Sequence, residues 1–208
     1  MVQHNRLSHA LLFLGKEGSG ALPMALAFAQ YVSLLPTNNG SQEPSLFGEP
    51  VEVKLPATAD EADTWMQKQP SFSKAAQMVH PDIHYSYPVI KKTTRSDEKP
   101  VSTDWAAEWR EFIQQYPYGN VYDWLQAIGA ENKQGNITAQ ECNDIIRKLN
   151  LKSFESGYKI LVLWMPEYLG KEGNKLLKLI EEPPADTLFI LVAENESSIL
   201  STILSRCQ

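Results

Sequence analysis

The chain has 208 residues, of which 43% are hydrophobic and 21% are charged, and its formal net charge is −6. This length is sufficient for a domain with a substantial core, and the composition is that of a globular protein rather than a disordered or fibrous one. The negative charge argues against tight binding of nucleic acid by this chain alone, because clustered Lys and Arg drive such binding by neutralising phosphates.

The sequence favours a cytoplasmic protein. Its apolar runs are shorter than the roughly 18–20 residues that a membrane span requires. The apolar run near the amino terminus, residues 10–14, is too short for a secretory signal. Because the only cysteines are Cys142 and Cys207, a disulfide framework is excluded, which fits a reducing compartment.

The first 35 residues predict a strand, a glycine-rich loop and a helix. Residues 10–14 (ALLFL) form a short apolar run closed by Gly15, which is typical of a buried strand in a parallel sheet. Residues 21–35 are rich in Ala, Leu and Met, and Pro23 falls in the first turn, where a missing N–H costs little. This order of elements opens a nucleotide-binding α/β fold.

The middle of the chain is less regular. Pro, Gly and Asn interrupt residues 36–79, which predicts an irregular insertion after the first helix, with a short helix at 60–68. Residues 83–89 alternate in the manner of a strand, and residues 102–115 and 121–131 have helical spacing. The aromatic face of the first of these helices is expected to be core rather than a base-stacking surface, and it comprises Trp105, Trp109, Phe112 and Ile113.

The last third alternates buried strands and helices, which predicts a parallel sheet with crossover helices on both faces. Thr138 is a suitable N-cap, and Glu141 three residues later predicts a capping box for a helix that reaches Leu149. The other predicted elements are strands at 160–164 and 188–192 and helices at 173–180 and 197–204, the first of these helices ended by Pro183. A single α/β domain over residues 1–208 is therefore expected.

The loop between the first strand and the first helix, GKEGSGAL, has the framework of a phosphate loop without its chemistry. In the working pattern G-x-x-x-x-G-K-[ST], the Lys neutralises phosphate charge and the hydroxyl binds magnesium. The glycines Gly15, Gly18 and Gly20 are present. The Lys and hydroxyl positions hold Ala21 and Leu22 instead. Most of the affinity for a triphosphate is expected to be lost, so no cofactor is predicted.

The second requirement of an ATPase also fails. The strand at 160–164 should end in acidic residues that position magnesium and the attacking water, but it ends in Trp164 and Met165. The alternative is an active ATPase with an unconventional loop, and its local candidates are Lys16 and Glu167. The first interpretation is that the fold is kept and the catalysis is lost.

Four segments carry a family pattern, namely residues 5–13 (NRLSHALLF), 80–84 (HPDIH), 174–184 (NKLLKLIEEPP) and 200–207 (LSTILSRC). In this order they resemble the bacterial clamp-loader family, which comprises the gamma, tau and delta-prime subunits of DNA polymerase III. Gamma and tau keep the intact phosphate loop, whereas delta-prime loses it. The substitutions at the loop and at the strand end therefore resemble the delta-prime kind.

The resemblance implies an AAA+ domain, with the P-loop NTPase type of parallel sheet, in a non-ATPase subunit of the clamp loader. Its implied partners are the gamma/tau and delta subunits, and through the complex the sliding clamp and primed DNA. The activity of the complex is that of a DNA-directed DNA polymerase. The lid and collar domains of the family are absent from residues 1–208.

The sequence departs from the family at the zinc module that usually follows the first helix. Residues 36–79 contain no cysteine, so no metal site is expected. His80 and His84 are four residues apart, but Pro81 disfavours a helix through them, and a structural or surface role is predicted. The insertion is expected to be poorly ordered or packed as an irregular lobe through Leu46, Phe47 and Trp65.

Arg206, in the match to S-R-C, is implied by the resemblance to be an arginine finger that acts on ATP bound to a neighbouring subunit. Such a group is worth about 10³–10⁵-fold in rate in other phosphoryl-transfer systems. The alternative is an exposed Arg that pairs with a nearby carboxylate. For Lys178, Glu181 and Glu182 a structural role is predicted, with Lys178 and Glu182 forming an i,i+4 pair.

A DNA-binding module is a further alternative. It would use a small basic group in the last third of the chain, Arg147, Lys148, Lys152 and Lys159. A group of this size is more typical of a solvated face, and the acidic net charge weighs against it.

Overall fold

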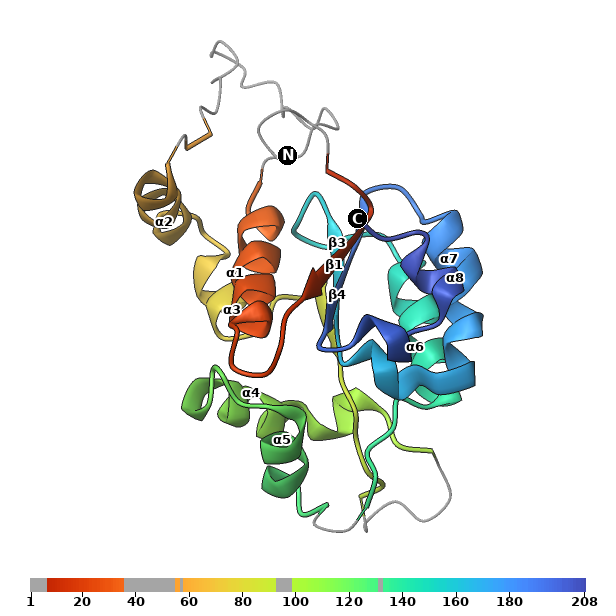
Figure 1. Cartoon of the computed structure of the whole chain (residues 1–208). Coiled ribbons are helices and arrows are strands. Elements are labelled where there is room, and N and C mark those ends of the chain that lie inside the picture. Colours follow the sequence, from red (N-terminus) through yellow and green to blue (C-terminus); the bar gives the residue numbers. More distant parts are fainter. Residues whose placement is uncertain (1–6, 36–54, 57, 93–98, 131–132) are drawn as a thin grey trace, which may run out of the picture.

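The computed structural model describes residues 7–35, 55–56, 58–92, 99–130 and 133–208. In this part of the chain, four parallel strands form one sheet in the order β1-β4-β3-β2 (Figure 1). The strands are β1 (Ala10–Leu14), β2 (Ile83–Ser86), β3 (Lys159–Trp164) and β4 (Thr187–Ala193). The predicted fold class, a parallel α/β sheet flanked by helices, is confirmed.

Helices cover both faces of the sheet. On one side lie α1 (Ala21–Ser33) and α3 (Phe72–Ala76), and on the other α6 (Ala139–Leu149), α7 (Leu177–Glu181) and α8 (Ser201–Leu204) (Figure 1). A third group, α4 (Ala106–Gln115) and α5 (Val121–Ala127), lies beyond the carboxyl-terminal ends of the strands, next to the loop between β1 and α1 (Figure 1). The remaining helical segments are α2 (Ala59–Gln67), η2 (Ser102–Trp105), η3 (Pro166–Leu176) and η4 (Glu196–Ser198).

Successive side chains of the central strands point to opposite faces of the sheet and so contribute to two hydrophobic cores. In β3, Ile160, Val162 and Trp164 face the α1 side, whereas Leu161 and Leu163 face the α6 side. Both sets are buried, so β3 is apolar throughout, as expected for a strand covered on two faces. Within the described ranges, each helix is too short or too polar to span a membrane.

The predicted strand at 83–89 is too long. β2 ends at Ser86, because the N–H of Tyr87 donates to Ser102 Oγ at 3.0 Å and Pro88 has no N–H for the ladder. Val89 then makes an isolated antiparallel bridge to Asn136.

Three predicted helices are also shorter or divided. The helix expected at 121–131 ends at Ala127, before Gly129 adopts a left-handed φ of 71°. The helix expected at 173–180 is a 3-10 segment followed by α7. The one expected at 197–204 is interrupted at Ile199, whose φ and ψ of −94° and 145° are extended. The helix at 102–115 is confirmed, with a first turn of 3-10 geometry.

Only half of the predicted capping box forms. Thr138 Oγ1 accepts a hydrogen bond from the N–H of Glu141 at 3.2 Å, so the N-cap is confirmed. The Glu141 carboxylate does not return to the N-cap, because it accepts the N–H of Ser102 at 2.7 Å. Burial raises the pKa of this carboxyl group, which is 2% exposed. A tertiary contact has replaced the local one.

Candidate functional site: a phosphate loop without its lysine

The loop between β1 and α1 keeps the backbone shape that its glycines predict. Gly18 and Gly20 have left-handed φ angles of 72° and 85°, which side chains other than glycine rarely adopt. The N–H of Gly15 donates to Ala193 O at 3.0 Å, which fixes the loop to the end of β4. The framework of a phosphate loop is therefore present in the folded chain.

The two positions that should bind phosphate and magnesium belong to the core instead. Leu22 is 5% exposed and packs into the cluster on the α1 side of the sheet. Ala21 is partly buried against the same cluster. Neither side chain has a polar atom to offer a ligand.

The end of β3 is equally apolar. Trp164 is buried, and its ring centroid lies 5.1 Å from that of Trp109 in α4. Met165 is buried in a left-handed conformation with φ 57°. The nearest acid, Glu167, accepts the backbone N–H groups of Glu194 and Asn195 at 2.7 and 2.9 Å. This carboxylate therefore holds the turn after β4.

The space that remains at the loop is small and carries acidic groups. The cavity there has a volume of about 30 Å³, whereas small-molecule sites typically occupy about 300–1,000 Å³. Glu17 and Glu194 are among its lining residues, and burial, together with Glu167 and Glu17, raises the pKa of Glu194. Among the described residues that line this cavity, Lys16 is the one with a positively charged side chain. Volume and charge both oppose a bound triphosphate.

Arg206 lies on the other side of the sheet, after α8. Its guanidinium forms an ion pair with Glu181 and donates to Thr202 O and, at 3.2 Å, to Ser205 Oγ. The pairing with a carboxylate is thus present in the single chain. It joins the two segments that carry the strongest family pattern, 174–184 and 200–207.

The predicted pair of Lys178 with Glu182 is wrong. Glu182 is the C-cap of α7, and its N–H still donates to Lys178 O at 3.0 Å, but among the described residues no ion pair joins the two side chains. The preceding acid, Glu181, is the one that forms an ion pair, with Arg206. The structural role predicted for Glu181 is confirmed.

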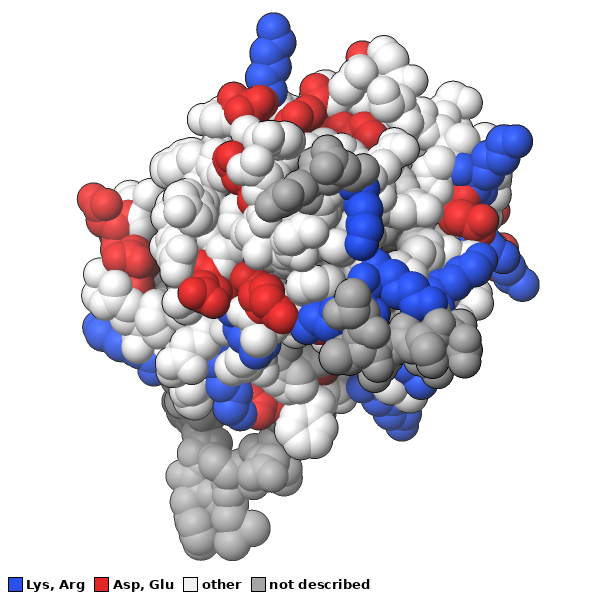
Figure 2. Space-filling model, turned by 90° about the horizontal axis from the view of Figure 1, so that it is seen from below, with Lys and Arg blue, Asp and Glu red and all other residues white. Residues whose placement is uncertain are grey.

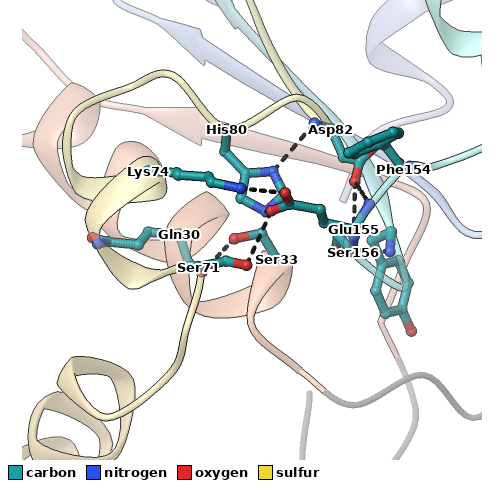
Figure 3. A network of polar contacts seen from close by, with 10 residues as sticks. Gln30, Ser33, Ser71, Lys74, His80, Asp82, Phe154, Glu155 and Ser156 are labelled. Carbon is teal, nitrogen blue, oxygen red and sulfur yellow. Dashed lines mark hydrogen bonds and ion pairs between the residues drawn. The ribbon is translucent and has the colours of Figure 1, made fainter.

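The HPDIH segment forms a structural network (Figure 3). His80 is buried, and its Nδ1 accepts the N–H of Asp82 at 3.2 Å, so the predicted structural role holds and a surface position is excluded. Burial lowers the pKa of His80, and burial lowers that of His84 to about 4. The Asp82 carboxylate accepts three backbone N–H groups at 2.6–2.7 Å, those of Phe154, Glu155 and Ser156.

Glu155 connects this network to α3, which lies within the predicted insertion. Its carboxylate accepts hydrogen bonds from Lys74 and, at 3.1 Å, from Ser71 (Figure 3). His80 Nε2 lies 3.9 Å from the same carboxylate. Among the described residues, no group of three or more His, Cys, Asp or Glu side chains could hold a metal ion.

The insertion is described only in part. Of its expected packing residues, Leu46 and Phe47 lie outside the described residues. Trp65 packs edge-on against Tyr31 of α1 at 6.0 Å between ring centroids. The short helix expected at 60–68 is confirmed as α2.

The basic group proposed for DNA binding does not form a surface cluster. Lys159 is buried, and its Nζ donates to Leu149 O at 2.6 Å and Leu151 O at 2.9 Å, which caps α6. Arg147 pairs with Asp144 at 3.0 Å. This group lies where α6 ends and β3 begins, whereas the opposite end of the molecule, seen from beyond the carboxyl ends of the strands, carries both acidic and basic side chains (Figure 2). The DNA-binding alternative thus loses one of its four residues to the interior.

No functional role was predicted from the sequence for the turn between α4 and α5, residues 117–120. Pro117, Tyr118 and Gly119 line the cavity at the phosphate loop, and the Asn120 amide donates to Glu17. The P-Y-G-N sequence signals a turn, but nothing in it indicates contact with a loop about a hundred residues earlier.

Sheet, loop and strand ends together define an α/β protein of the phosphate-loop kind that lacks the usual Lys, hydroxyl and acidic residues. The model of a protein family described as "DNA polymerase III, delta subunit" matches residues 57–208, and the chain belongs to this family. The resemblance to the delta-prime kind of clamp-loader subunit is confirmed.

Similar proteins carry the name DNA polymerase III subunit delta'. That of Bacillus subtilis (strain 168) is 24% identical over 207 residues, which are 100% of this chain and 43% of the relative. That of Yersinia pestis is 34% identical over 92 residues, 43% of this chain and 26% of the relative. The chain thus spans less than half the length of these relatives. A gamma subunit-related protein from Thermotoga maritima aligns with a TM-score of 0.40 at 14% identity, over 97% of this chain and 40% of that one.

Proposed function

We propose that this chain is the AAA+ domain of a non-ATPase, delta-prime subunit of the bacterial DNA polymerase III clamp loader. It would assemble with gamma/tau and delta subunits in the cytoplasm and help load the sliding clamp onto primed DNA. Family membership and the four matched segments support the place in the complex. The observation that carries the non-ATPase role is the burial of Leu22 and Trp164 at positions where an ATPase needs a hydroxyl and an acid.

The active-ATPase alternative has little local support. It needs a cation and an acid from near the loop. Glu167, its candidate acid, already accepts two backbone N–H groups, and releasing it would leave both without a partner. Lys16 would have to neutralise a triphosphate beside Glu17 and Glu194.

Arg206 is proposed to act in trans as the arginine finger. An Arg suits this role because its charge is permanent and its planar guanidinium can meet two phosphate oxygens at once. The ion pair with Glu181 supports a resting position at the domain surface. On contact with a neighbouring nucleotide, the guanidinium would exchange this carboxylate for phosphate oxygens.

Titration calorimetry with Mg–ATP on the whole protein tests the non-ATPase role. We expect no specific heat of binding and no hydrolysis. Magnesium-dependent affinity in the micromolar range would contradict the proposal and favour the ATPase alternative. Copurification with gamma/tau and delta tests the place in the complex separately.

A further inference from the structure

The turn between α4 and α5 closes the phosphate loop from outside. Tyr118 Cε1 lies 3.3 Å from the position that a Cβ on Gly20 would occupy. Asn120 Nδ2 donates a hydrogen bond to Glu17 Oε1. With Pro117 and Gly119, Tyr118 forms one wall of the residual cavity of about 30 Å³. Residues 117–120, here called the plug, therefore contact the loop at two of its positions.

The plug has a fixed shape. The N–H of Gly119 donates to Tyr116 O at 2.9 Å. A Cβ on Gly119 would lie 2.7 Å from Phe112 Cζ and 3.0 Å from Tyr116 O, so this close approach to α4 requires glycine. Asn120 is also the N-cap of α5, since its side-chain oxygen accepts the N–H of Asp123 at 2.8 Å.

Trp164 anchors the helix that carries the plug. Its ring lies 5.1 Å from Trp109 and 6.4 Å from Phe112, both on α4. Trp164 occupies the position where an ATPase of this fold has an acid, and it lines the cavity at the loop. Trp164 therefore takes the place of a magnesium-binding acid and also packs against α4 next to the ends of the strands.

The plug lies where this kind of fold binds its ligands. Open parallel α/β sheets bind ligands outside the carboxyl ends of their strands, and α4 and α5 occupy that place (Figure 1). We propose that the plug replaces the nucleotide: it fills the approach to the phosphate loop and holds the loop in one conformation that does not depend on ATP. This proposal rests on the proposed lack of ATP use and adds how the loop is stabilised without it.

Hydrogen exchange on the whole protein, followed at the amides of residues 15–24, tests the plug. Tyr118→Ala removes the ring over Gly20, and we expect exchange there to accelerate at least about tenfold. Tyr122→Ala is the matched control, because Tyr122 is 62% exposed against 63% for Tyr118 and hydrogen-bonds to Gln126 within α5. Equal exchange in the two variants would overturn the proposal.

A swap of the polar contact gives a second, independent measurement. Asn120→Asp keeps an N-cap oxygen for α5 but sets two carboxylates against each other at Glu17, so loop exchange should accelerate. The double variant Glu17→Gln/Asn120→Asp restores a donor and an acceptor in reversed order, and slow exchange should return. Failure of this rescue would contradict the plug.

Adding Mg–ATP to the wild-type protein separates the two proposals. If Mg–ATP does not change hydrogen exchange in the loop, the proposed lack of ATP use is supported. The exchange rates of the variants then test the plug separately. Protection of residues 15–24 by ATP would overturn both, since the loop would then depend on nucleotide.

Discussion

The rings of Trp164 in β3 and Trp109 in α4 lie 5.1 Å apart at an angle of 43°. This contact joins the end of the sheet to the helices that cover the phosphate loop. It also explains why an apolar residue stands where the fold ordinarily has an acid: Trp164 lies in an aromatic cluster that includes Phe112.

Restoring the acid should therefore damage the fold instead of creating an ATPase. We expect Trp164→Asp to lower the free energy of unfolding by about 3–5 kcal/mol or more, because it removes a large buried ring and buries a charge. Trp164→Phe keeps an aromatic ring and should lower the free energy of unfolding by less. Urea unfolding followed by circular dichroism measures both, and a neutral effect of Trp164→Asp would show that the ring does not support the core.

The second prediction concerns Asp82, which accepts the backbone N–H groups of Phe154, Glu155 and Ser156. Asp82→Ala leaves these donors without a protein partner, so we expect a loss of about 2–4 kcal/mol in the free energy of unfolding. Asp82→Asn retains one acceptor oxygen and should lower the free energy of unfolding by less. Asp144→Ala, which breaks only the surface pair with Arg147, is the control and should change stability by less than about 0.5 kcal/mol.

The third prediction is a pH dependence that comes from His84. Burial first, and then the charge of Lys148, lowers the pKa of His84 in the folded chain from 6.5 to about 4. The folded state therefore binds fewer protons than the unfolded state between these values. Stability from this group is complete above pH 6.5 and falls as the pH decreases toward 4.

At pH 5 the loss from His84 amounts to about 2 kcal/mol relative to neutral pH. We expect His84→Gln to reduce the difference in unfolding free energy between pH 7.5 and pH 5 by this amount. His9→Gln, at an exposed position, controls for the loss of a histidine as such. If both variants keep the wild-type difference, His84 does not titrate in this window.

The sequence predicts the sheet and the loss of the phosphate- and magnesium-binding side chains from the loop, because both depend on local patterns. The apolar runs that form β1, β3 and β4 are continuous in the sequence. The replacement of the phosphate-binding Lys and the magnesium-binding hydroxyl by Ala21 and Leu22 can be recognised within residues 15–22. The early end of β2 depends instead on Ser102, fifteen residues further along the chain, which accepts the N–H of Tyr87.

Contacts between distant residues account for what the sequence did not predict. Glu141 satisfies the capping-box pattern, yet its carboxylate is used by Ser102, 39 residues away. The plug is a stronger case, because Asn120 and Glu17 are 103 positions apart. A turn motif predicts that the chain reverses there, but only the packing of α4 on Trp164 brings that reversal to the phosphate loop.

The last prediction concerns Arg206 as a group acting on a neighbouring subunit. In the single chain it pairs with Glu181, and a partly exposed pair of this kind contributes little to folding. Arg206→Ala and Arg206→Lys should therefore leave the unfolding free energy within about 0.5 kcal/mol of wild type. Lys keeps the charge but not the planar fork, so both variants should reduce the ATPase of the complex.

The measurement is the clamp- and DNA-stimulated ATPase of a complex rebuilt with each variant, alongside its assembly by gel filtration. A loss of about 10³-fold or more at one ATP site, with normal assembly, is the expected result. Glu181→Gln is the matched control: it breaks the same ion pair but leaves the guanidinium in place, so the ATPase should persist. If Glu181→Gln is as defective as Arg206→Ala, the ion pair itself is what matters, and Arg206 acts as a structural residue. Wild-type ATPase activity with Arg206→Ala would exclude the arginine finger, because hydrolysis in the complex would then not depend on this guanidinium.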